Sequence, residues 1–105
     1  MMKKVYTIEE IRNIIVPRLK QLDATRIALF GSYARGEAKA DSDVDILVSL
    51  PDIIDIPKYL ETKDALRQVL GKDVDILDYR DISRFIKDEV LADSIIIYDK
   101  SQERY

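Results

Sequence analysis

Residues 30–48 read FGSYARGEAKADSDVDILV, and this stretch decides the fold. The apolar run at residues 25–30 is typical of a short buried strand, and Gly31 ends it. Residues 43–50 form a second run that is typical of a strand. We therefore expect two strands joined by a tight or helical turn at residues 32–36 and then by a polar loop.

Asp43 and Asp45 stand two residues apart in the second predicted strand. In a strand, residues i and i+2 point to the same face, with Cα atoms about 6.5–7 Å apart. Both carboxylates should then share one face, while Val44, Ile46 and Val48 face a core. Two like charges side by side repel each other unless a cation lies between them. The pair therefore suggests a metal site, and the alternative is two solvated aspartates at a strand edge.

Gly31 and Ser32 form a candidate phosphate site. A helix N-terminus offers free backbone N–H groups and a positive dipole end, both of which suit phosphate. Glycine has no side chain to block the approach of a ligand to the backbone, and the serine hydroxyl can add a hydrogen bond. A Gly-Ser pair alone means little, since it also fits a plain capped turn. The pair lies only one loop before Asp43 and Asp45, and this proximity to a candidate metal site favours the interpretation as a phosphate site.

A third strand is predicted at residues 73–77, which read DVDIL. Asp73 and Asp75 share one face of it, and either could lie beside Asp43 and Asp45 if the two strands are neighbours. The chain has no histidine. The role of general base would then fall to a carboxylate or to the substrate itself.

The composition of the chain excludes several classes of function and of metal site. The 105 residues suffice for one domain, which we place at residues 1–105, and the net charge of −3 argues against an extended nucleic-acid surface. The chain has no cysteine, which excludes disulfides and a thiolate nucleophile, and a zinc site needs cysteine or histidine in nearly all cases. Oxygen-only ligands favour hard ions such as Mg²⁺ or Mn²⁺. We see no signal peptide and no run of about 20 apolar residues, so we expect a cytoplasmic protein with no membrane association.

The remaining elements complete an α/β (α+β-type) fold with a small mixed β-sheet flanked by helices. A helix at residues 7–22 opens with the capping-box pair Thr7 and Glu10, and Pro17 predicts a kink or a break in it. A second helix at residues 55–70 ends at Gly71. We expect its inward residues to be Ile56, Tyr59, Leu60, Leu66, Val69 and Leu70.

Two more elements follow near the C-terminus. A short helix is predicted at residues 82–91 and a last strand at residues 94–98, and the polar tail from residue 99 is expected to fray. The apolar side of that helix would consist of Ile82, Phe85, Ile86 and Val90.

The spacing Gly31-Ser32, ten residues, then Asp43-Val44-Asp45 resembles the signature of the DNA polymerase beta-like nucleotidyltransferase superfamily. The surrounding Ala-Arg-Gly and Asp-Ser-Asp resemble its minimal nucleotidyltransferase (MNT) branch. This resemblance implies a polymerase beta-like fold and transfer of a nucleotide from an NTP, with two Mg²⁺ ions as cofactor and Mn²⁺ as the alternative ion.

The resemblance also implies a role for each matching residue. Gly31 and Ser32 would bind the NTP phosphates, and Asp43 and Asp45 would ligate Mg²⁺. Asp75, rather than Asp73, matches the place of the third acidic residue, which would complete the metal site and act as base. Arg35 would pair with a phosphate, although a surface position on the helical turn fits it equally well.

The length of the chain points to a partner. Only residues 99–105 follow the last predicted strand, so we expect another molecule to complete the acceptor site. The chain resembles the antitoxins of HEPN/MNT toxin–antitoxin pairs, which implies a hetero-oligomer that neutralises a HEPN ribonuclease toxin by transferring AMP from ATP to its tyrosine. The alternatives are a small-molecule (aminoglycoside-like) nucleotidyltransferase with a partner subunit, an antitoxin that acts by binding alone, and an inactive α/β domain.

Overall fold

Four strands form one mixed sheet in the computed structural model, which describes residues 4–83 and 87–102. Their order across the sheet is β3-β2-β1-β4. β1 is antiparallel to both of its neighbours, whereas β2 and β3 are parallel. The predicted mixed sheet is thus confirmed, with each strand within two residues of its expected ends. The strands are β1 (Arg26–Phe30), β2 (Val44–Ser49), β3 (Val74–Asp78) and β4 (Ile95–Asp99).

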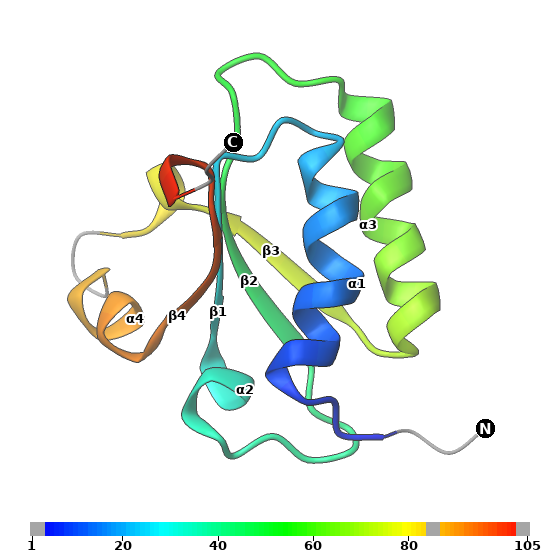
Figure 1. The fold of residues 1–105 in the computed structure, drawn as a ribbon, viewed down its shortest axis with the longest axis vertical. Helices are drawn as coiled ribbons and strands as arrows, with labels where there is room; N and C mark the ends of the chain where they lie inside the picture. The colour runs from blue at the N-terminus through cyan, green and yellow to red at the C-terminus, as the bar shows by residue number, and fades with distance from the viewer. Residues whose placement is uncertain (1–3, 84–86, 103–105) are drawn as a thin grey trace.

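The helices α1 (Ile8–Lys20) and α3 (Ile56–Leu70) lie side by side on one face of the sheet (Figure 1). Every second residue of β2, beginning with Val44, points into the core beneath them. Burial of these apolar side chains is the main force that holds the layers together. The fully buried members of this core are Ile11, Ile15, Leu19, Ile27, Leu29, Val44, Ile46, Val48 and Leu66.

The expected capping box starts α1. The Thr7 hydroxyl accepts from the backbone N–H of Glu10 at 3.0 Å, and the Thr7 N–H donates to the Glu10 carboxylate at 2.9 Å. These bonds satisfy backbone donors that the first turn leaves free. Pro17 does not break the helix, which continues to Lys20. The predicted end at residue 22 is two residues too far.

The opposite face of the sheet has a smaller apolar cluster built on Ala28, Leu47 and Ile82. The helix α4 (Lys87–Asp93) lies on this side (Figure 1). The predicted start of this helix at Ile82 is wrong, because Ile82 and Ser83 are not helical and follow the 3₁₀ turn η1 (Tyr79–Asp81). The predicted contacts of Phe85 and Ile86 lie outside the described residues.

Two further expectations are corrected. Ile56, Leu60 and Val69 of α3 are 55%, 56% and 46% exposed, because the apolar residues of α3 span a wider arc than the one that faces the sheet. The tail is ordered beyond its predicted fraying point, since Asp99 belongs to β4 and the 3₁₀ turn η2 (Lys100–Gln102) follows it. None of the helices in the described ranges has both the length and the apolar character needed to cross a membrane.

Candidate active site

Gly31 begins the short helix α2 (Gly31–Arg35) directly after β1. Its φ of +72° is one that residues with a side chain rarely adopt. A Cβ on Gly31 would lie 3.2 Å from Cγ of Asp45 and would overlap with its Oδ2. Backbone conformation and close approach both require glycine at this position. The predicted turn is therefore in direct contact with the predicted metal-binding strand.

Asp45 is placed as the alternation of residues predicts, whereas Asp43 lies outside the strand. Val44, Ile46 and Val48 are fully buried in the core below the helices, whereas Asp45 points to the other face. Asp45 is half-buried, and its Cα is paired with that of Phe30 on β1. Asp43 is exposed and lies just before the first residue of the strand.

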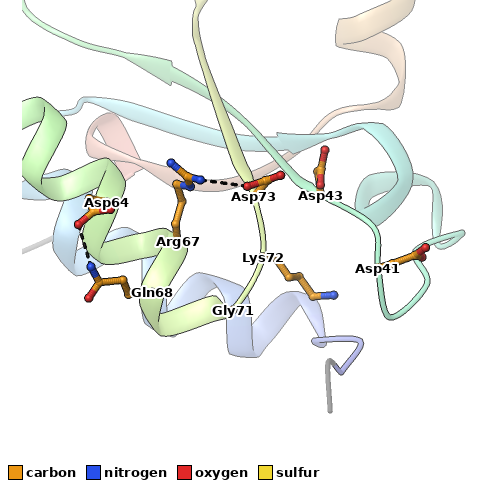
Figure 2. Close-up of a pocket in the computed structure, with 8 residues that line it drawn as sticks. All are labelled: Asp41, Asp43, Asp64, Arg67, Gln68, Gly71, Lys72 and Asp73. Atoms are coloured by element: carbon orange, nitrogen blue, oxygen red, sulfur yellow. Dashed lines mark hydrogen bonds and ion pairs between the residues drawn. The ribbon is translucent and has the colours of Figure 1, made fainter. Parts of the chain in front are cut away.

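Asp75 lies directly beside Asp45, since the two are Cα partners in the parallel pairing of β2 with β3. Asp73 lies before the start of β3, and Arg67 donates to its carboxylate at 3.2 Å (Figure 2). The pairing brings Gly31, Asp45 and Asp75 together. It favours Asp75 over Asp73 as the neighbour of Asp45.

Electrostatics link the three carboxylates. Burial raises the pKa of Asp45 to about 6, and further contributions come from the charge of Asp75, a hydrogen-bonding contact with Asp75 and the charge of Asp43. The Arg35 guanidinium acts in the opposite direction, but more weakly. Concentrated negative charge on a half-buried strand face is costly by itself, and a bound cation would relieve it.

The other predicted site residues surround this group. Ser32 follows Gly31, and no side chain caps the first turn of α2. Arg35 is close enough to influence Asp45, but its ion pair is with Glu37 at 3.1 Å. Tyr33 is 4% exposed and belongs to the core.

Two cavities adjoin Asp43. One of about 220 Å³ also touches Asp75, and its lining consists of Asp43, Lys63, Arg67, Asp73, Val74 and Asp75. The other, of about 420 Å³, lies beside it at the C-terminal end of α3 (Figure 2). Sequence analysis missed Lys63, Arg67 and Lys72 in these walls. The four-residue spacing of Lys63 and Arg67, on a helix that leads into the DVDIL strand, was the available signal.

The donor set suits a hard cation, since it consists only of carboxylate oxygens. Among residues 4–83 and 87–102, however, no three acidic side chains are already arranged as a complete set of metal ligands. Mg²⁺ is commonly held by one or two carboxylates together with substrate phosphates. Asp43, Asp45 and Asp75 could supply carboxylate oxygens to such a cation, and substrate phosphates would supply the remaining ligands.

A mixed sheet with neighbouring carboxylates on two parallel strands, beside a glycine-led helical turn, is the arrangement that the resemblance to nucleotidyltransferases implies. The chain belongs to the polymerase beta nucleotidyltransferase family, because the model described as "Polymerase beta, Nucleotidyltransferase" matches residues 9–103. This confirms the resemblance and the fold inferred from the Gly-Ser and Asp-x-Asp spacing.

Similar proteins refine this assignment. The protein adenylyltransferase MntA of Thermococcus cleftensis is 38% identical over 95 residues, which cover 87% of this chain and 96% of that protein. A crystal structure of a toxin–antitoxin with AMP-PNP matches with a TM-score of 0.73 at 30% identity, covering 87% of this chain and 75% of that one. A structure of the tri-AMPylated Shewanella oneidensis HEPN toxin in complex with MNT antitoxin matches with a TM-score of 0.67 at 27% identity, covering 90% and 74%.

Proposed function

We propose that this chain is an antitoxin nucleotidyltransferase that transfers AMP from ATP to a tyrosine hydroxyl of a partner HEPN toxin and so neutralises it. Its similarity to an adenylyltransferase and to chains of toxin–antitoxin complexes supports this proposal. The observation that carries it is the pairing of Asp45 with Asp75 beside the turn at Gly31. Half-buried Asp45 and exposed Asp75 form one negatively charged patch beside Gly31, which suits a metal-bound triphosphate.

Asp43 and Asp45 would hold Mg²⁺, and Asp75 would complete the site. When bound, the ions would offset charge on the attacking and leaving oxygens of an in-line displacement. The raised pKa of Asp45 supports this assignment, because a bound cation would stabilise the carboxylate charge that burial and the neighbouring carboxylates disfavour. The nucleotide phosphates would supply the ligands that the carboxylates alone do not.

The turn at Gly31 would hold the phosphates. The N-cap residue of α2, Phe30, makes no side-chain cap bond, and the first N–H groups of the helix would donate to phosphate oxygens. Ser32 would add its hydroxyl. Arg35 would exchange its exposed ion pair with Glu37 for a phosphate, which costs little because such pairs contribute little in water.

The transfer itself then follows from these positions. The acceptor oxygen forms a bond to the α-phosphorus of ATP, and the bond from that phosphorus to the bridging oxygen of the β-phosphate breaks. Asp75 takes the proton of the acceptor hydroxyl, and pyrophosphate leaves with the electron pair of the broken bond. The protein mainly supplies orientation and a fixed electrostatic environment.

Intact-mass spectrometry tests the proposal directly. The purified protein is incubated with MgATP and the product of its neighbouring gene, with the double variant Asp43→Asn and Asp45→Asn as the inactive control. Mass gains of whole AMP units on the partner, absent in the control, are the expected result. Digestion of the modified partner should place each AMP on tyrosine.

Other outcomes would contradict the proposal. A complex without any mass gain would indicate neutralisation by binding alone. Without a gain or a complex, small molecules such as aminoglycosides would become the acceptors to test.

A further inference from the structure

Lys72 is a buried cation. It is 6% exposed and is the one charged side chain found buried within the described ranges. Lysine is almost never fully buried without a partner, because removing an ammonium group from water is costly. An apolar residue could fill the same space without that cost. The contacts of the ammonium group should therefore explain its presence.

Those contacts join three segments of the chain. Lys72 follows Gly71, the C-terminal cap of α3, and its Nζ donates to the carbonyl oxygen of Ala40 in the loop at residues 37–43. The same nitrogen lies 6.0 Å from the ring centre of Tyr33 in α2, at the limit of a cation–π contact. Figure 2 shows the side chain extending from the start of β3 toward the loop that carries Asp41.

Near its start the loop is attached to α2 and to the core: the Glu37 N–H donates to the Ser32 carbonyl at 2.9 Å, and Ala38 packs against the core cluster. In its middle, the Ser42 N–H donates to the Lys39 carbonyl at 3.0 Å and the Lys39 N–H donates to the Ser42 hydroxyl at 2.8 Å, so both bonds lie within the loop. At its end, the Val44 N–H donates to the Asp73 carbonyl at 3.0 Å. The bond from Lys72 thus ties the middle of the loop to the corner from which β3 begins.

The candidate metal ligands Asp43 and Asp45 differ in how the backbone holds them. Asp45 is inside the strand and has Cα partners on both sides, Phe30 and Asp75. Asp43 precedes the strand: the bond from the Val44 N–H to the Asp73 carbonyl holds the peptide group on its C-terminal side, and the loop holds its N-terminal side. A group that holds the loop therefore also helps to set the position of Asp43.

We propose that Lys72 is a positioning residue that holds the loop at residues 37–43, and hence the Asp43 carboxylate, in line with Asp45 and Asp75. This inference rests on the proposed function, since it assigns Lys72 to the same reaction. Lys72 itself would touch neither the nucleotide nor the acceptor. Residues that orient metal ligands typically change metal affinity or activity by about 10- to 100-fold when replaced.

Steady-state AMP transfer by Lys72→Met is the first test. Lys58→Met, an exposed lysine of α3, is the matched control. We expect kcat for Lys72→Met to fall by about 10- to 100-fold, with a similar rise in the half-saturating Mg²⁺ concentration and little change in KM for ATP. Lys72→Arg, which keeps a charged donor, should recover most of the lost activity. A rise in KM for ATP alone would overturn the proposal, because it would place Lys72 on the nucleotide.

Hydrogen–deuterium exchange of the protein without nucleotide supplies a readout that does not depend on activity. Exchange in residues 37–43 should become faster in Lys72→Met, while α1 stays protected. Unchanged exchange in the loop would overturn the proposal. If Lys72→Met does not fold, Lys72→Gln, which keeps a neutral donor, takes its place with the same expected pattern.

The two proposals can fail separately. If the wild-type protein transfers no AMP to its partner, the proposed function is contradicted. The loop exchange and the Mg²⁺ dependence of AMP-PNP binding then still decide the role of Lys72, since both should change in Lys72→Met and remain normal in Lys58→Met.

Discussion

Asp45 and Asp75 are Cα partners on the parallel strands β2 and β3, and the charge of Asp75 contributes to the raised pKa of Asp45. Asp73 stands two residues earlier, before β3 begins, and its carboxylate accepts from Arg67 instead. The two aspartates of DVDIL therefore have different surroundings, and this difference can be tested.

Asp75→Asn should lower kcat/KM for AMP transfer by about 100-fold or more, because it removes the proposed base and a metal ligand. Asp73→Asn should change it by less than about 5-fold, since it breaks only an exposed ion pair. Parallel intact-mass time courses of the two variants measure the difference. A larger loss in Asp73→Asn would reverse the choice of third carboxylate.

Asp45→Asn should stabilise the protein when Mg²⁺ and nucleotide are absent. The folded-state pKa of Asp45, about 6, exceeds its ordinary value of 3.8. A raised carboxylate pKa contributes stability below pH 3.8 that is lost as the pH rises through 6. At pH 7.5 we expect the unfolding free energy of the variant to exceed that of wild type by about 1 kcal/mol, after allowance for partial exposure of Asp45. This difference in unfolding free energy should disappear near pH 4.

Urea denaturation at several pH values measures this effect, with the exposed Asp41→Asn as control. Addition of Mg²⁺ and AMP-PNP should stabilise wild type but not Asp45→Asn, because the ligand needs the carboxylate. If the difference in unfolding free energy between Asp45→Asn and wild type does not depend on pH, the charge of Asp45 is not the cause of that difference.

Much of the site was predictable because it is local. The spacing of Gly31, Asp43 and Asp45 lies within one stretch of chain, and strand alternation correctly placed Val44 and Ile46 in the core. The contact between Gly31 and Asp45 was not predictable. It depends on the register in which Phe30 opposes Asp45 across β1 and β2.

Gly31→Ala tests that contact. The added Cβ would overlap with Oδ2 of Asp45, whereas a Cβ on Gly36, which has nearly the same positive φ, would meet no atom within 4 Å apart from its own neighbours in the chain. Both variants should lose about 1 kcal/mol of unfolding free energy from backbone strain. Gly31→Ala alone should also lose AMP transfer by about 100-fold, since displacement of a reacting group by about 1 Å can cost that much. Equal activity in the two variants would contradict a functional role for the contact.

Burial along α3 was the least predictable feature of the fold. Apolar periodicity shows which residues share a helix face, but the tilt of α3 against α1 and the sheet decides which part of that face is covered. Leu66 is fully buried, whereas Leu60, predicted to face inward with it, is 56% exposed. Burial of Lys72 was likewise not predictable from the local sequence, because its ammonium group contacts Ala40 and Tyr33, which are distant in the chain.

The variants Leu66→Ala and Leu60→Ala test whether Leu66 is buried and Leu60 is exposed. Leu66→Ala should lose about 2–5 kcal/mol of unfolding free energy, because it removes buried methyl groups and leaves a cavity. Leu60→Ala should lose less than about 0.5 kcal/mol, since water already reaches most of this side chain. Urea denaturation of the isolated protein gives both values, and the helical signal in circular dichroism checks that α3 still forms. Similar losses in the two variants would mean that α3 is rotated toward the sheet, with Leu60 inside the core as its spacing first suggested.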